Sequence, residues 1–139
     1  MRVGMPVIGC AVVGVVLALT TMTRVSTWQD ERRLWAEAAV QSPMKPRPWL
    51  NLGRQWHLAG DLDQAAVTYR HAADVAASPA RSPDERRIGR AYAEHNLAAV
   101  LIAQQQWGEA RSLIAALRTR HPRFQPAAIL ERALPQNLR

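Results

Sequence analysis

The chain has 139 residues and a formal net charge of +7, from 18 Lys and Arg against 11 Asp and Glu. Hydrophobic residues make up 48% and charged residues 21%, which excludes a largely disordered chain. The single cysteine, Cys10, excludes a disulfide framework and a zinc site built from several cysteines. The length accommodates one small domain beside a terminal segment.

The first segment is apolar. Residues 3–23 contain no charged side chain and lie between Arg2 and Arg24. At about 1.5 Å per residue this run is roughly as long as the 30 Å hydrocarbon core of a bilayer is thick. We therefore predict a transmembrane anchor over residues 1–25. A cleavable signal peptide is the alternative, but the run is long for one and no good cleavage site follows it.

Small residues recur within this segment. Cys10, Gly14 and Ala18 are spaced four apart and would share one helix face. Such a face lets a second membrane helix approach closely, so these residues are a candidate docking face. The alternative is that membrane helices are simply rich in Gly and Ala. The basic residues on either side of the segment do not settle its orientation.

Beyond Arg24 the sequence is typical of helices. Apolar residues recur at intervals of three and four, alanine is abundant, and Gly and Pro interrupt the pattern at regular places. Short connections predict that neighbouring helices pack antiparallel. The pattern predicts helices over residues 27–41, 47–59, 62–77, 84–105, 108–120 and 126–133.

One pair of these helices has a repeat pattern. The aromatic and small residues that define it are Trp49, Leu52, Gly53, Trp56, Gly60, Ala65, Tyr69 and Ala72. Their spacing resembles that of the tetratricopeptide repeat (TPR). We expect Gly53 and Ala65 to be small because two helices cross closely there, with Trp49, Trp56 and Tyr69 filling the surrounding space.

A second unit keeps the same register, with Glu94 where the first unit has Trp49. The matching residues are Leu97, Ala98, Trp107, Ala110 and Pro122. The predicted TPR-like domain covers residues 26–139, with a half-repeat at 27–43, repeats at 46–79 and 91–122, an inserted loop at 78–88 and a capping helix at 124–134. The predicted fold is thus all-α, with one N-terminal transmembrane helix followed by a short TPR-like antiparallel helical solenoid.

A narrower resemblance concerns the stretch from Trp28 through Trp35 and Pro43 to Gly53. Its order of residues is similar to the TPR tails that follow the last membrane span of bacterial polytopic glycosyltransferase-like proteins. In that family the tail faces the periplasm, so the resemblance implies a periplasmic repeat domain. Together with the one predicted span, this predicts a single-pass protein of the bacterial inner membrane. This chain departs from that family by having one predicted span, so the resemblance carries no transferase activity.

The sequence contains no motif that indicates catalysis. A glycine-rich phosphate loop, a paired-carboxylate box and a nucleophile motif are all missing, and no two of the four histidines have ligand spacing. We therefore expect no enzyme activity, no metal and no cofactor.

The TPR resemblance does indicate a binding face. In TPR domains the first helix of each pair lines a concave groove, which here gives the candidate peptide-groove residues Arg47, Leu50, Asn51, Arg54, His57, Tyr92, His95 and Asn96. Asn96 fits the clamp that some TPR domains use for a terminal carboxylate, whereas Leu50 and Arg54 do not. The alternative is a solvated groove on a scaffold of only two units.

The last third of the chain is basic. Its cationic residues are Arg111, Arg118, Arg120, His121, Arg123, Arg132 and Arg139, against Glu109 and Glu131. A solvated face is the favoured interpretation. Contact with anionic lipid or an acidic protein remains open, while nucleic acid is disfavoured because no stacking aromatics lie among these arginines.

These observations predict a non-catalytic, membrane-anchored TPR scaffold or accessory subunit. Its partners would be other protein subunits of a membrane complex of the photosynthetic, respiratory, secretion or envelope class. An anchor and a second contact together raise the effective concentration, so each can be weak. The alternatives are a regulatory domain of a membrane glycosyltransferase and a free-standing peptide receptor.

Overall fold

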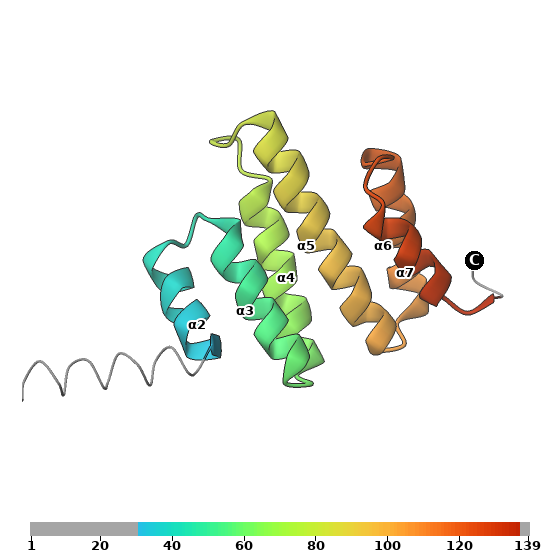
Figure 1. Cartoon of the computed structure of the whole chain (residues 1–139), viewed down its shortest axis with the longest axis horizontal. Helices are drawn as coiled ribbons and strands as arrows, with labels where there is room; N and C mark the ends of the chain where they lie inside the picture. The colour runs from blue at the N-terminus through green and yellow to red at the C-terminus, as the bar shows by residue number, and fades with distance from the viewer. Residues whose placement is uncertain (1–30, 137–139) are drawn as a thin grey trace, which may run out of the picture. The chain divides into compact units, whose positions relative to one another are not determined.

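The computed structural model describes residues 31–136, and within this range it consists of six α-helices without a strand (Figure 1). The helices are α2 (Glu31–Gln41), α3 (Pro46–Leu58), α4 (Leu62–Ala76), α5 (Pro83–Ala103), α6 (Trp107–Arg120) and α7 (Pro126–Ala133). Residues from 35 onward form one compact unit, and the residues before 35 belong to another. Within the described residues, the helix positions predicted from the spacing of apolar residues are confirmed to within a few residues, and the start predicted at residue 27 lies outside them.

The predicted fold class was wrong in its membrane part. None of the helices in the described range is both long and apolar enough to cross a bilayer. The longest, α5, has 21 residues, but its first turns carry the charged sequence Asp84 to Arg87. The predicted anchor over residues 1–25, with Cys10, Gly14 and Ala18, lies outside the described residues. What the structure describes is therefore an all-α fold without a membrane-spanning helix.

Helix ends are set by local hydrogen bonds. Helix α5 begins at a capping box, in which Glu85 N donates to Ser82 Oγ at 3.3 Å and Ser82 N donates to Glu85 Oε2 at 3.0 Å. These bonds satisfy backbone donors that the first turn of a helix leaves unpaired. Helix α4 begins at a simpler cap, in which Gln64 N donates to Asp61 Oδ1 at 3.2 Å.

The helices pack in a repeating order. Each of α3 to α6 packs against the helix that follows it, and α5 also contacts both α3 and α7 (Figure 1). Helix α5 thus lies beside both α3 and α7. Helix α4 connects α3 to α5, and α6 connects α5 to α7. This arrangement is a repeat-like helical fold, with α5 at its centre.

Small side chains make the close packing feasible. Ala65, Ala98 and Ala110 are fully buried in one core cluster with Leu101 and Ile114. Because alanine has no side chain beyond Cβ, the backbones of neighbouring helices can approach closely at these positions. The core therefore lies where α4, α5 and α6 meet.

Gly53 and Tyr69 form the tightest point of the α3–α4 crossing. The Tyr69 ring is 2% exposed, and burial raises the pKa of its hydroxyl to about 12, against a smaller opposing effect of Arg54. A Cβ added to Gly53 would lie 2.7 Å from Tyr69 Cε1 and 2.8 Å from Tyr69 Cδ1. The glycine predicted at this crossing is thus required by the space that the ring occupies.

Substitution of this glycine tests the crossing. Gly53→Ala is expected to destabilise the fold by about 1–3 kcal/mol, because the buried ring has to shift. Urea denaturation of the full chain, followed by circular dichroism, measures the change. Gly108→Ala is the control: Gly108 lies in α6 with nothing within 4 Å of its added Cβ, so it should be neutral or stabilise by up to about 1 kcal/mol. Equal losses in both variants would contradict the argument.

Candidate functional site

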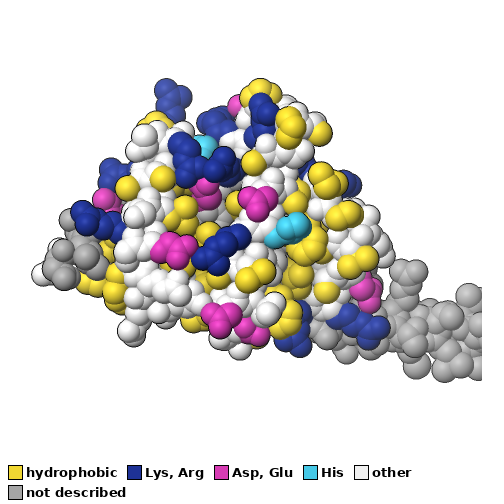
Figure 2. Space-filling view, turned by 180° about the vertical axis from the view of Figure 1, so that it is seen from behind, with side chains coloured by type: hydrophobic (Ala, Val, Ile, Leu, Met, Phe, Trp, Pro, Cys, Tyr) yellow, Lys and Arg dark blue, Asp and Glu magenta, His cyan; other side chains and the backbone are white. Residues whose placement is uncertain are grey.

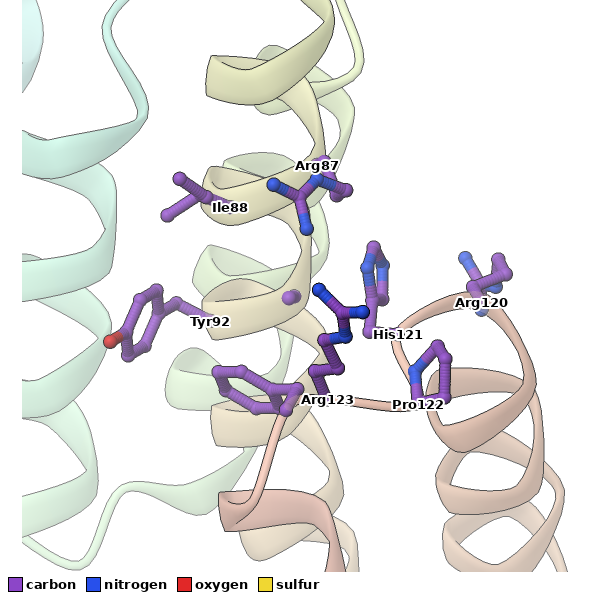
Figure 3. A pocket seen from close by; sticks show the side chains of 9 residues that line it. Arg87, Ile88, Tyr92, Arg120, His121, Pro122 and Arg123 are labelled. Carbon is purple, nitrogen blue, oxygen red and sulfur yellow. The ribbon is translucent and has the colours of Figure 1, made fainter.

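A pocket of about 450 Å³ lies between the first half of α5 and the end of α6 with the residues that follow it (Figure 3). We call it the aromatic pocket. Helix α5 contributes Arg87, Ile88, Ala91 and Tyr92, and the other side contributes Arg120, His121, Pro122, Arg123 and Phe124. Neighbouring helix packing brings together two segments that are far apart in the sequence.

The floor of the aromatic pocket is apolar and fixed. Phe124 packs edge to face against Tyr92, with ring centroids 5.3 Å apart, and against His95 at 5.7 Å. Phe124 also packs on the core cluster formed by Ala91, Leu117 and Ala127, which anchors the segment after α6. Edge-to-face aromatic pairs are favourable beyond their buried area. The rings therefore hold one another in place.

Part of this apolar surface is open to solvent. Ile88 is 51% exposed and Tyr92 is 50% exposed, although both line a hollow. Large apolar side chains that remain exposed in a concave site are typical of binding surfaces. The aromatic pocket thus offers a place for an apolar group of a ligand.

The rim of the aromatic pocket is cationic. Figure 3 shows the side chains of Arg87 and Arg123 extending into the same space from opposite sides, with His121 beside them. Arg87 Nη2 donates to Asp84 Oδ1 at 3.1 Å, but both side chains are largely exposed. An exposed pair of this kind contributes little free energy, so Arg87 can exchange Asp84 for another carboxylate.

A second hollow adjoins the aromatic pocket. It has a volume of about 360 Å³ and is lined by Ala77, Arg86, Arg87, Arg90, Arg120 and His121. We call it the arginine hollow. Figure 2 shows basic side chains gathered around a histidine on one face of the molecule. Arg87, Arg120 and His121 line both spaces, so the two hollows share a wall.

Glu94 is the anion that holds this region together. Its side chain is 6% exposed, and its Oε1 accepts from Arg90 Nε at 2.8 Å and from Arg120 Nη1 at 2.7 Å. Its Oε2 is buried without a hydrogen-bond partner among residues 31–136. A buried carboxylate requires positive charge close by, so Arg90 and Arg120 serve the fold.

His121 is predominantly neutral at pH 7. Burial lowers the pKa of its imidazole below the usual value of 6.5. Glu94 opposes this effect, and the cations of Arg120 and Arg87 lower the pKa further. The positive charge of the site at neutral pH therefore comes from its arginines.

Two of the predicted groove residues belong to this region. Tyr92 lines the aromatic pocket, and His95 packs against its Phe124. The other six do not line the pocket: Arg47 and Arg54 are exposed, Asn51, His57 and Asn96 are half-buried, and Leu50 packs on the core. Peptide binding along the whole predicted groove remains a prediction.

Several residues of the site were not foreseen from the sequence. Arg87 and Ile88 belong to the segment interpreted as an inserted loop, and Phe124 was assigned to a capping helix. Arg123 was counted only as part of a basic, solvated region. The available signal was Glu94, which replaces the aromatic residue of the first unit and indicates that the second unit is packed differently.

Other interactions of the basic region are structural. Arg118 pairs with Glu131 between α6 and α7, and Arg70 pairs with Glu109 at 2.9 Å between α4 and α6. Residues 31–136 contain no group of three or more His, Cys, Asp or Glu side chains placed to hold a metal ion.

Comparisons with protein families, curated proteins and solved structures give no match for this chain.

The Glu94 bridge predicts unequal effects of removing its partners. Glu94→Gln should cost about 1 kcal/mol, because the half-exposed arginines become solvated. Arg90→Met combined with Arg120→Met should cost about 3 kcal/mol or more, because a buried carboxylate loses both its cations. Urea denaturation of both variants at pH 7 measures the difference. Equal losses would show that Glu94 is not desolvated in the native state.

His121 predicts a pH dependence of stability. Its pKa is lower in the folded chain, so below about pH 6.5 the unfolded chain binds a proton that the folded chain does not. Stability should therefore fall as the pH decreases from about 7.5 to 5.5. His121→Gln removes this contribution and should reduce the loss of Tm over that range. His95, whose pKa burial also lowers, accounts for a remaining part. An unchanged loss of Tm in His121→Gln would contradict the prediction.

Proposed function

We propose that residues 31–136 act as a non-catalytic protein-interaction module, similar to a TPR domain, within a scaffold or accessory subunit. The observation that carries this proposal is the aromatic pocket, in which half-exposed Ile88 and Tyr92 face a hollow with an arginine rim. An apolar centre with a polar rim is the usual anatomy of a protein interface. The partner would be a segment of another protein subunit.

The arrangement of the helices supports this proposal. Helical-repeat domains bind extended segments along a surface built by successive helices, since each repeat adds to the same face. Here α5 contacts both α3 and α7, so its exposed residues lie next to two other helices. The TPR resemblance adds to this argument through Gly53, whose predicted close crossing the structure contains. The predicted periplasmic location stays a prediction.

The pocket is also held in position by packed elements. Phe124 is fixed by the core cluster beneath it, and Glu94 ties the end of α6 to α5. A preorganised site loses less conformational entropy when it binds, so a small contact surface can give useful affinity. This rigidity favours a site that recognises a ligand over a surface that is merely solvated.

Selection from a random peptide library tests the proposed module. The full chain is immobilised and a phage-displayed library of random peptides is selected against it. Bound peptides should lose at least about tenfold in affinity for a variant carrying Ile88→Ser and Tyr92→Ser, because their apolar contacts are removed. Fluorescence polarisation with synthetic copies of the selected peptides measures the loss.

A matched variant controls for general loss of apolar surface. Leu58 and Ile129 are 69% and 67% exposed and lie outside the pocket, so Leu58→Ser with Ile129→Ser should bind the same peptides as the unmodified chain. Circular dichroism checks that both double variants keep their helices. Failure to enrich any peptide, or equal binding to the two double variants, would refute the proposal.

A further inference from the structure

The aromatic pocket and the arginine hollow adjoin one another, and we treat the two together as one candidate binding cleft. Arg87, Arg120 and His121 line both spaces, so the two hollows meet at these side chains. The two spaces differ in chemistry. Only the aromatic pocket is lined by Ile88, Tyr92 and Phe124, and only the arginine hollow is lined by Arg86 and Arg90. The cleft is therefore apolar at one end and cationic at the other.

The arginines of this cleft are not all available to a ligand. Arg90 and Arg120 share the buried carboxylate of Glu94 and are needed there. Arg87 pairs only with the exposed Asp84, while Arg86 and Arg123 form no ion pair with another residue in the range 31–136. Arg86, Arg87 and Arg123 can therefore receive an anion without uncovering a buried charge.

We propose that this cleft recognises an acidic segment of a partner protein in which an apolar side chain stands beside Asp or Glu residues. This inference rests on the proposed function and specifies its ligand. The apolar side chain occupies the aromatic pocket next to Tyr92. The neighbouring carboxylates bind Arg87 and Arg123 at the rim, and a further one reaches Arg86 in the arginine hollow.

Charge complementarity carries the acidic part of the argument. Guanidinium groups bind carboxylates through two parallel N–H···O bonds, which favours arginine where an anion is held in one orientation. Figure 3 shows Arg87 and Arg123 converging on the same space from opposite sides, as a carboxylate between them would require. The neutral His121 beside them adds no competing charge but can donate or accept a hydrogen bond.

The position of the cations indicates side-chain carboxylates and not a chain end. Arg123 lines only the aromatic pocket, and Arg86 lines only the arginine hollow. Arg87 lines both spaces. A terminal carboxylate supplies one negative group at one point. A run of acidic side chains follows the cleft past the shared wall and meets each of these arginines in turn.

Two matched peptide pools test this inference on the full chain. Both are capped at each end, so that neither carries a free terminal carboxylate. In the first pool a central Phe or Leu is flanked by Asp or Glu, and in the second the flanking residues are Asn or Gln. Fluorescence polarisation should show that the acidic pool binds about tenfold more tightly than the amide pool. Added salt should weaken the binding of the acidic pool only.

Variants then assign the preference to the cleft. The double variant Arg87→Gln with Arg123→Gln should bind the acidic pool no more tightly than the amide pool. Its affinity for the amide pool should equal that of the unmodified chain. Arg111→Gln is the control, because Arg111 is an exposed arginine of α6 outside both hollows. Ile88→Ser should weaken both pools, because it acts on the apolar contact they share.

The outcomes separate this inference from the proposed module. If selected peptides depend on Ile88 and Tyr92 but the two pools bind equally, the module stands and the acidic preference is overturned. The preference is also overturned if neither of the capped pools binds. A third outcome is that the chain binds anionic lipid vesicles but not the acidic pool. If Arg87→Gln with Arg123→Gln then abolishes the vesicle binding, the cleft is assigned to a membrane surface and the acidic preference is overturned.

Discussion

Glu94 is a buried carboxylate at the interface between α5 and α6, and the surrounding structure is arranged to accommodate it. Burying a charge is costly unless opposite charges stay close, so Arg90 and Arg120 have to reach the same oxygen atom. Arg90 lies one turn away on α5, whereas Arg120 is the last residue of α6. This bridge holds the end of α6 against α5 and places residues 121–124 beside the start of the long helix.

The first helix pair solves the same packing problem without charge. Trp49, which the predicted repeat register aligns with Glu94, packs its ring edge to face against His71 of α4, with centroids 4.3 Å apart. Its Nε1 donates to the carbonyl oxygen of Pro43 at 2.9 Å. An aromatic contact of this kind draws no guanidinium group to the crossing. On α5 the buried carboxylate of Glu94 instead draws Arg90 and Arg120 to the contact with α6.

The first turns of α5 supply the other wall of the cleft. Pro83 to Ile88 extend α5 at its start, and the capping box of Ser82 and Glu85 stabilises that first turn. Without this extension, α5 would lack Arg86, Arg87 and Ile88, which line the two hollows. The start of α5 thus adds both an apolar and a cationic group at one edge of the helical stack.

The sequence by itself determined the six described helices, because apolar spacing, capping residues and Gly and Pro positions act locally. It also identified Gly53 as a crossing point, since only a residue without Cβ fits beside a ring such as Tyr69. It did not find the cleft, and a span predicted over residues 1–25 has no counterpart among the described helices. Arg87 and Arg123 are distant in the chain and carry no shared motif. Only the antiparallel packing of α5 and α6 brings them together, because that contact depends on apolar side chains and on the Glu94 bridge between residues far apart in the chain and not on local sequence.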